Sequence, residues 1–436
     1  MKDVIRCIEK EKEALLKFND ELIDEYSPLS SWGNEKYKKD CCKWTGVSCD
    51  YQTNHIVELD LGGMGLRGNI SISLLEIQHL KYLDLSDNDF NYSRIPQFIG
   101  SLGRLQHLDL SYSNFSGEIP HHLGNLSELN SLHLSSSTNG SLTSTNLDWL
   151  SRLHSLKNLS MYSVNLTMAT DWLQIITKLT QLQHLFLDSC NLPMVLPPSP
   201  FNASNSLSAF GLTGNEFSSS WIFPLVFNLS SGLTLLDLSS NKLQGEIPIS
   251  LGNMSRLTSL YLYGNQFTGE VPCPALSSSL TDLDLSNNMF NDCNVGPHFP
   301  TWLRTQTRLK YLDISNAEIS NTFPDWFWEL SPKLRTLNVS NNNFQGKEVE
   351  YINTLNLVKL IDLSSNNLVG DVPTEITSLV TLVGLNLSRN NLSGFLPPNI
   401  ERLKSLDFLD FSKNHFSSGI PIGVSQLDRL GVLDLS

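Results

Sequence analysis

A glycine-rich segment near the N-terminus has the spacing of a dinucleotide-binding loop. The segment Gly63-Met-Gly65-Leu-Arg-Gly68 fits G-x-G-x-x-G, and Asp87 follows about 20 residues later. A nucleotide site of this kind needs a helix that begins at the loop and directs its N-terminus at the pyrophosphate. The residues that follow, Asn69-Ile-Ser-Ile-Ser73, instead match a turn pattern that recurs along the chain. We therefore expect no nucleotide site here.

Other catalytic signals are weak. Neither H-E-x-x-H, G-x-S-x-G nor a Walker loop occurs, and the ten histidines show no ligand spacing beyond the pair His121-His122. The chain has 44 acidic and 30 basic residues, a net charge of −14 and no long stripe of lysine and arginine. Because an acidic surface repels phosphate backbones, nucleic acid is not expected as a partner. We expect no enzyme activity, no cofactor and no metal ion.

Four of the seven cysteines lie close together at the N-terminus: Cys7, Cys41, Cys42 and Cys49. This density indicates a small module held by disulfides, for which three pairings are possible. Zinc is the alternative, but the adjacent Cys41 and Cys42 lack the C-x-x-C spacing of a zinc site. Cys273 and Cys293 have similar offsets in neighbouring segments, which is compatible with a further disulfide.

Thirteen N-x-S/T sequons are distributed over the chain. They begin at Asn69, Asn91, Asn114, Asn125, Asn139, Asn158, Asn165, Asn202, Asn228, Asn253, Asn338, Asn386 and Asn391. Together with the cysteine-rich segment they favour the secretory route. No apolar run reaches the roughly 20 residues of a membrane helix, and residues 1–6 are too short for a signal peptide. We therefore expect the natural N-terminus to be truncated or wrongly assigned in this sequence.

A leucine pattern with a period of about 25 residues runs through most of the chain. The first apolar residues of its L-x-L-S-x-N units are Leu59, Leu83, Leu108, Leu132, Leu159, Leu185, Phe210, Leu236, Leu260, Leu283, Leu312, Leu337, Ile361, Leu385, Leu409 and Leu433. In one unit, Leu83 and Leu85 point inward from a short strand, while the residues between and beside them point outward. Stacked units therefore build a long parallel sheet over a continuous leucine core, as in a leucine-rich repeat.

An asparagine ends most of these strands. It recurs as Asn88, Asn215, Asn241, Asn265, Asn288, Asn342, Asn366, Asn390 and Asn414. Because an amide side chain has both donors and an acceptor, stacked copies are expected to satisfy the backbone where each strand turns away. Cys190 occupies this position in one repeat, and we interpret it as a buried thiol and not as a nucleophile.

The second half of each unit reads L-x-G-x-I-P, as in residues 115–120 and 243–248. Glycine permits turns that other residues resist, and proline suits the end of a strand. This half predicts short strands and 3₁₀ turns in place of long helices on the convex side. Irregular spacing and an insertion near residues 138–149 are expected to interrupt the pattern.

Residues 1–55 precede the first repeat and fit an N-terminal cap, which an open stack needs to cover its core. The segment Glu9–Phe18 predicts a helix that turns Leu15, Leu16 and Phe18 toward the core, and two tryptophans add bulk. Residues 56–436 then hold about sixteen repeats, the last of them truncated.

The repeat L-x-x-L-x-L-S-x-N-x-L-x-G-x-I-P and the cap segment Cys41-Cys-Lys-Trp44-Thr-Gly46-Val-Ser-Cys49 resemble the plant-specific leucine-rich-repeat family. The resemblance covers the chain from Ile56 onward as well as the cap. It implies an α/β solenoid, a right-handed superhelix with a concave parallel sheet and a disulfide-stapled cap. It also implies the pairs Cys7–Cys41 and Cys42–Cys49.

The concave sheet is the expected recognition surface. Its central outward position is aspartate in many repeats: Asp60, Asp84, Asp109, Asp237, Asp284, Asp313, Asp362, Asp410 and Asp434. Like charges on neighbouring strands are unfavourable, so this stripe is either tolerated in solvent or used for a basic ligand. Repeats that replace this aspartate give more information about ligand binding, because exposed aromatic residues and histidines on a rigid sheet are typical of binding patches. We expect ligand contacts at His133, Ser160, Tyr162, His184, Phe186, Asp188, Tyr261 and Tyr263.

Residues 146–193, with Asn146-Leu-Asp-Trp149-Leu and Asp171-Trp172-Leu, closely resemble receptor-like proteins of the ethylene-inducing-xylanase receptor type. That resemblance implies a kinase-less plant immune receptor at the outer face of the plasma membrane, which recognises microbial proteins and signals through partner receptor kinases. The ectodomain of a receptor kinase and a secreted inhibitor of the polygalacturonase-inhibitor type are alternatives. The chain stops inside a repeat strand at Leu433-Asp-Leu435-Ser436, so we expect an ectodomain fragment.

Overall fold

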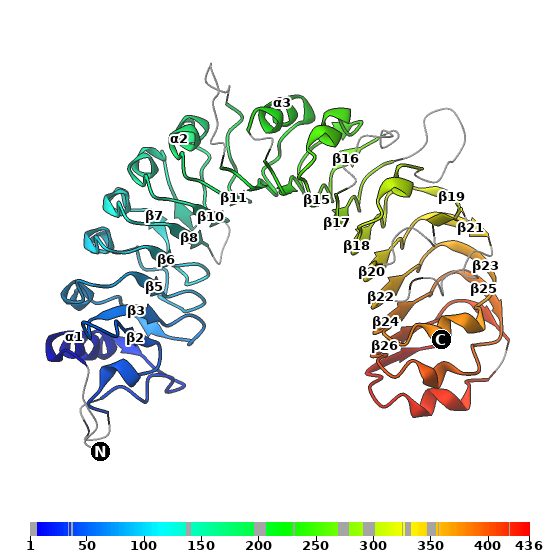
Figure 1. The fold of residues 1–436 in the computed structure, drawn as a ribbon, viewed down its shortest axis with the longest axis horizontal. Helices are drawn as coiled ribbons and strands as arrows, with labels where there is room; N and C mark the ends of the chain where they lie inside the picture. The colour runs from blue at the N-terminus through cyan, green and yellow to red at the C-terminus, as the bar shows by residue number, and fades with distance from the viewer. Residues whose placement is uncertain are drawn as a thin grey trace. The chain divides into compact units, whose positions relative to one another are not determined.

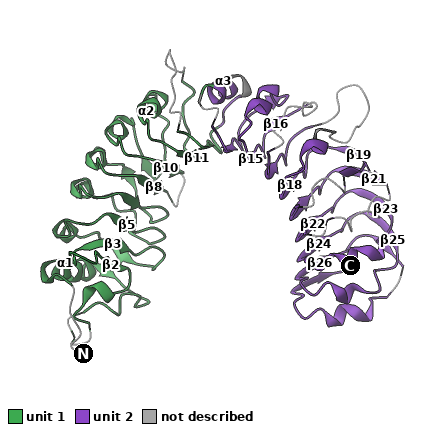
Figure 2. Cartoon of the chain, in the orientation of Figure 1, with its two compact units in different colours: residues 1–215, 228–230 green, residues 216–227, 231–436 purple. Residues whose placement is uncertain are grey.

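The computed structural model describes residues 7–33, 35, 38–136, 141–195, 206–229, 232–268, 279–290, 301–324, 326–327, 333–346, 355, 357–417 and 419–436 (Figure 1). The chain divides into two compact units, residues 1–215 with 228–230 and residues 216–227 with 231–436 (Figure 2). In each unit the strands of the main sheet run along one side, and 3₁₀ helices run along the opposite side. Each unit is therefore described by itself.

The first unit contains a sheet that is parallel apart from its first strand. Its strands are β2 (Val47–Cys49), β3 (Ile56–Asp60), β5 (Tyr82–Asp84), β6 (His107–Asp109), β8 (Ser131–Ser135), β10 (Asn158–Tyr162), β11 (His184–Asp188) and β12 (Ala209–Gly211). β2 is antiparallel to β3, and each later strand is parallel to the one before it. The register places leucine beside leucine from Leu59 to Leu185, and these side chains are buried. This continuous core confirms the repeat assignment.

The second unit repeats the arrangement. Its parallel strands are β13 (Leu235–Asp237), β15 (Ser259–Tyr261), β17 (Asp282–Asp284), β18 (Tyr311–Asp313), β20 (Thr336–Asn338), β22 (Leu360–Asp362), β24 (Gly384–Asn386), β26 (Phe408–Asp410) and β28 (Val432–Asp434). We call the solvent-facing side of either main sheet the sheet face. It carries the residues that alternate with the buried leucines.

Short strands and 3₁₀ helices form the rest of most repeats, as the glycine–proline pattern predicts. The strands are β1 (Leu22–Ile23), β4 (Arg67–Gly68), β7 (Gly117–Glu118), β9 (Leu142–Thr143), β14 (Gln244–Gly245), β16 (Gln266–Phe267), β19 (Ser320–Thr322), β21 (Asn343–Gly346), β23 (Asn367–Asp371), β25 (Asn391–Gly394) and β27 (His415–Phe416). The 3₁₀ helices are η1 (Cys41–Lys43), η2 (Ile72–Glu76), η3 (Gln97–Ser101), η4 (His121–Asn125), η5 (Asp148–Arg152), η6 (Ile249–Asn253), η7 (Thr301–Thr305), η10 (Thr374–Ser378), η11 (Ile400–Arg402) and η12 (Ile422–Gln426).

Two repeats depart from that expectation and contain α-helices. They are α2 (Trp172–Lys178) and α3 (Ser219–Leu229). Neither segment contains the G-x-I-P sequence that turns the chain into a short strand elsewhere. Apolar residues at helical spacing replace it, and in α2 Trp172, Leu173 and Ile176 are buried. The prediction of 3₁₀ turns in place of helices is therefore wrong for these two repeats.

The strand-end asparagines form the hydrogen-bonded ladder that the sequence predicts. In one repeat the side-chain amide of Asn366 donates to the carbonyl oxygens of Val339 and Leu363, both at 3.1 Å. Its Oδ1 accepts the backbone N–H of Phe344 at 3.0 Å. Asn88 makes the corresponding contacts to Leu61, Leu85 and Leu66. Each amide thus joins consecutive repeats at a point where the main-chain ladder ends.

Cys190 lies in this ladder as a fully buried residue. Its Sγ–H donates to the carbonyl oxygens of Met161 at 3.5 Å and Asp188 at 3.3 Å. Burial raises the pKa of the thiol to about 12, so the thiolate required of a nucleophile is disfavoured. These contacts support the interpretation of Cys190 as a structural thiol.

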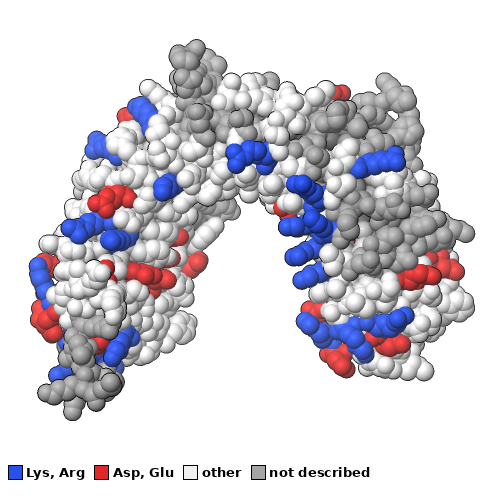
Figure 3. Space-filling view, viewed as in Figure 1, with Lys and Arg blue, Asp and Glu red and all other residues white. Residues whose placement is uncertain are grey.

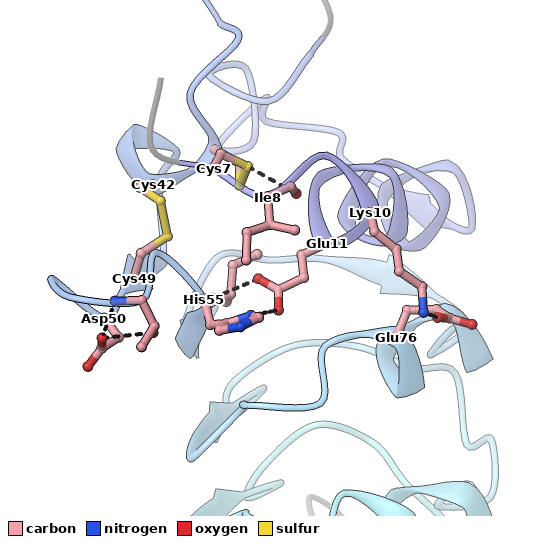
Figure 4. Close-up of polar contacts among 12 residues, drawn as sticks. Cys7, Ile8, Lys10, Glu11, Cys42, Cys49, Asp50, His55 and Glu76 are labelled. Carbon is pink, nitrogen blue, oxygen red and sulfur yellow. Dashed lines mark hydrogen bonds and ion pairs between the residues drawn. A yellow bond between two sulfur atoms is a disulfide. The ribbon is translucent and has the colours of Figure 1, made fainter. Parts of the chain in front are cut away.

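The N-terminal segment is held together by disulfides and is joined to the first repeats by polar contacts (Figure 4). Disulfides join Cys7 to Cys41 and Cys42 to Cys49, the pairs that the family resemblance implies. Helix α1 (Glu9–Asp20) buries Leu15 and Phe18, whereas Leu16 is half-buried. The rings of Trp32 and Trp44 stack with centroids 5.4 Å apart.

The sequence gives no indication of the contact that Glu11 makes from α1. Its carboxylate is buried, accepts the backbone N–H of Ile56 at 2.8 Å and lies 2.8 Å from Nδ1 of His55. The ion pair between Lys10 and Glu76, at 2.5 Å, adds a second link from the helix (Figure 4). A buried carboxylate therefore holds the start of the first repeat strand against the helix.

The glycine-rich segment has no dinucleotide-binding geometry. Gly68 belongs to β4, which pairs antiparallel with β1, and no helix begins directly after it. Gly68 has φ +110°, and a Cβ atom there would lie 2.3 Å from the carbonyl oxygen of Glu21. The glycine is therefore needed for the close approach of β4 to β1.

Candidate ligand-binding surface

The aspartate stripe has a structural role that the sequence does not reveal. Oδ1 of Asp84 accepts the backbone N–H of Ser86 at 2.8 Å, two residues further along the chain. Eight other aspartates make the same contact: Asp60, Asp109, Asp237, Asp284, Asp313, Asp362, Asp410 and Asp434. Asn338 and Asn386 occupy the same position and make it through Oδ1. Each side chain caps the end of its own strand, and this requirement accounts for the stripe.

On four neighbouring strands of the first unit, other residues replace the capping aspartate. The register aligns His133, Ser160, Phe186 and Gly211 across β8, β10, β11 and β12. Tyr162 and Asp188 align in the same way on β10 and β11. We call Tyr112, His133, Ser160, Tyr162, His184, Phe186 and Asp188 the aromatic patch. The structure thus brings together the six residues that the sequence predicts in the first unit.

Tyr112 belongs to the patch but was missed in the sequence. Its ring lies against that of Tyr162 with centroids 5.9 Å apart, and 46% of its surface is exposed. Its φ is +54°, and the corresponding residues of other repeats, among them Asp87 (+51°), Arg389 (+54°) and Lys413 (+54°), share this positive φ. Tyr112 is therefore distinguished by its exposed aromatic ring and not by its backbone conformation. Tyr112 therefore extends the patch to the repeat before β8.

Phe186 is positioned by the glycine beside it. A Cβ atom on Gly211 would lie 2.4 Å from Cδ1 and 2.9 Å from Cε1 of Phe186. The ring thus covers the glycine of the next strand, half-buried, with one side left to solvent. A rigid, partly exposed aromatic ring is a common anchor in protein interfaces.

Polar residues surround the aromatic rings. Nδ1 of His184 lies 2.6 Å from Oδ1 of Asn158, and Nε2 of His133 lies 2.8 Å from Oγ of Ser131. Oδ1 of Asp188 accepts the backbone N–H of Thr213 at 2.9 Å. These contacts fix the side chains at the rim of the patch. An apolar centre with an ordered polar rim is the usual composition of a protein-binding surface.

Tyr261 and Tyr263, the two other predicted contacts, belong to the second unit. Tyr261 aligns with Asp237 and Asp284 on the neighbouring strands. Burial raises the pKa of Tyr261, and the carboxylate of Asp282 raises it further. Tyr263 follows β15 and has 36% of its surface exposed. Their part in ligand binding stays a prediction.

A second group of ionisable residues lies on β5 and β6 of the first unit. The rings of Tyr82 and His107 stack at 4.2 Å. Burial raises the pKa of Tyr82 to about 12, with further contributions from Asp84 and Asp60. Burial also lowers the pKa of His107, as does the neighbouring His133. The hydroxyl of Tyr82 and the imidazole of His107 are therefore held neutral beside Asp60 and Asp84.

The sequons fall into two groups. Asn139 and Asn202 lie outside the described residues, which leaves eleven of the thirteen. The exposed asparagines are Asn69, Asn91, Asn125, Asn228, Asn253 and Asn391, and the half-buried ones are Asn114, Asn158, Asn165, Asn338 and Asn386. In two of the latter the amide donates to an aspartate of the preceding strand. Glycosylation at all these positions stays a prediction.

Comparisons with known proteins agree with the repeat. Family models match as a leucine-rich repeat N-terminal domain over residues 8–50, a leucine-rich repeat region over 52–195, and leucine-rich repeats at 232–254, 256–276, 308–330, 333–355 and 381–403. Receptor-like protein EIX2 of Solanum lycopersicum is 41% identical over 81% of this chain. Receptor-like protein EIX1 of the same plant is 38% identical over 59% of it. The chain belongs to the plant leucine-rich-repeat receptor-like proteins.

The family resemblance and the fold class inferred from the sequence are thus confirmed. The receptor-like chain spans 33% of the length of EIX2 and 26% of that of EIX1. Its fold is similar to a solved structure titled "Plant peptide hormone receptor RGFR1 in complex with RGF2", with a TM-score of 0.59 and 24% identity. The alignment covers 90% of this chain and 72% of that one.

Within the described residues no helix is long and apolar enough to cross a membrane. Cys273 and Cys293 lie outside those residues.

Proposed function

We propose that this chain is a ligand-recognition region of a plant receptor-like protein that acts in defence at the cell surface. The aromatic patch binds a protein ligand of microbial origin, without catalysis, and partner receptor kinases carry the signal onward. Relatives named as receptor-like proteins support the receptor role. They also favour it over a receptor kinase or a secreted inhibitor of polygalacturonase.

The observation that carries the proposal is the position of the patch. Three of its residues, His133, Ser160 and Phe186, replace the capping aspartate on consecutive strands, so the side chains at these positions do not serve as strand caps. Tyr112 is exposed and its ring lies against that of Tyr162, so it does not contribute to the buried core. Exposed aromatic side chains gathered at one place on a folded surface are typical of a binding site.

Tyr112→Gly provides the test. Glycine adopts positive φ without strain, so the variant is expected to fold at least as stably as the wild type. Binding is measured by biolayer interferometry against purified proteins secreted by plant-infecting fungi, an ethylene-inducing xylanase among them. We expect a protein of this set to bind, and its Kd to rise about tenfold in the variant, because an interfacial ring is lost.

The control is Tyr51→Ala, which removes a tyrosine that is 80% exposed and lies outside the patch. It should bind like the wild type. The proposal fails if no protein of the set binds, or if Tyr112→Gly and Tyr51→Ala have the same affinity.

A further inference from the structure

Three cations form a column on the second unit. Lys310, Arg335 and Lys359 each immediately precede a strand, β18, β20 and β22 respectively. The backbone N–H of Arg335 donates to the carbonyl of Lys310 at 2.8 Å, and that of Lys359 donates to Arg335 at 2.7 Å. The three residues are thus direct neighbours across the sheet, spaced by about 4.8 Å. Figure 3 shows lysine and arginine side chains gathered along this edge of the unit. We call these residues the basic column.

The column is unusual for the repeat and unfavourable for the isolated chain. The preceding repeats place Thr258 and Thr281 at this position, and the first unit has no two cations side by side there. Like charges on neighbouring strands destabilise a sheet. All three side chains are exposed, and none has a carboxylate partner among the residues that the structure describes. The charge is therefore available to an anionic partner.

Apolar surface continues the column on its next strand. The backbone N–H of Val383 donates to the carbonyl of Lys359 at 2.7 Å, so Val383 is the next residue of the column. Leu360, directly after Lys359, is 43% exposed and covers Gly384, where a Cβ atom would lie 2.5 Å from its Cδ1. Val383 itself is 36% exposed. Cations and aliphatic groups thus share one surface, and a partner must present both carboxylates and apolar side chains.

From this juxtaposition we infer that the basic column and the adjacent Leu360 and Val383 dock an extended, acidic segment of a protein partner. The column spans about 10 Å, which is close to the reach of three residues of extended chain. Two or three carboxylates of one segment therefore reach all three cations. An anionic polysaccharide would satisfy the charges but would leave the aliphatic groups uncovered. The surface belongs to the second unit and needs no residue of the aromatic patch.

The test uses a fluorescein-labelled peptide, Leu-Leu-Glu-Ser-Glu-Ser-Glu-Leu-Leu, and fluorescence anisotropy with the full chain. Wild type should bind at low ionic strength, and added salt should weaken binding. Arg335→Gln with Lys359→Gln should raise Kd about tenfold, since two charge contacts are lost. The matched control is Arg389→Gln with Lys413→Gln, which removes two exposed cations outside the column of the same unit. The control and Phe186→Ala should bind like the wild type.

Two altered peptides separate the contribution of the carboxylates from that of the apolar side chains. Glutamine in place of glutamate should abolish binding, and serine in place of leucine should weaken it severalfold. The inference is overturned if the control pair loses as much affinity as the column pair, which would indicate net charge alone. It is also overturned if the wild type does not bind the peptide, or if oligogalacturonate binds the column as tightly as the peptide does.

Discussion

Phe186→Ala is expected to weaken binding of the secreted fungal protein selected by biolayer interferometry about thirtyfold. This is the largest loss expected for any single residue of the aromatic patch. The ring is rigid, partly exposed and held over Gly211, so it gives a partner apolar area at little entropic cost. Affinity is measured by biolayer interferometry. Thermal unfolding of the same sample is expected to show only a small loss of stability, since the ring is not part of the buried leucine core.

Gly211→Ala tests the position of the ring as opposed to its presence. The added methyl group would lie 2.4 Å from the present place of Cδ1, so the ring must move while every patch side chain is retained. A loss of affinity comparable to that of Phe186→Ala would assign the effect to ring placement. Unchanged affinity in both variants would exclude Phe186 as a ligand contact.

Asn366→Ala is expected to lower the free energy of unfolding of the second unit by about 2–3 kcal/mol. The substitution leaves the buried N–H of Phe344 without its acceptor and removes the donor for two buried carbonyls. Because repeats contact only their neighbours, the loss acts at the junction of consecutive units. Urea denaturation monitored by circular dichroism gives the value.

The adjacent Asn367 is the matched control. It is exposed, and its amide donates to Oδ1 of Asn343 at the surface. Asn367→Ala is expected to change the free energy of unfolding by less than about 0.5 kcal/mol. Equal effects of the two alanine substitutions would contradict the structural role of the ladder.

The repeat could be predicted from the sequence because its physics is local. Alternating leucines such as Leu83 and Leu85 define a strand, and a side chain with both donor and acceptor at Asn88 is suited to the turn that follows. The helices α2 and α3 are not expected from the default repeat, because these segments lack its G-x-I-P sequence. An absent motif is a weaker signal than a present one.

The site was only partly predictable, because its geometry depends on neighbours that are distant in sequence. Tyr112 and Tyr162 are separated by two repeats, and only the three-dimensional structure shows their contact. The cap made by Asp84 to Ser86 explains why aspartate is the default, which composition alone left open between solvent exposure and a basic ligand. The basic column likewise becomes visible only when strand register aligns Lys310, Arg335 and Lys359.

The most direct test of the proposed recognition surface is site-specific photo-crosslinking to the fungal protein that binds. A benzoylphenylalanine at Tyr162 lies within the aromatic patch, whereas one at Ile72, 64% exposed on η2, lies on the opposite side of the same unit. We predict an ultraviolet-dependent covalent complex from position 162 and none from position 72. A complex formed from position 72 and not from position 162 would contradict the account.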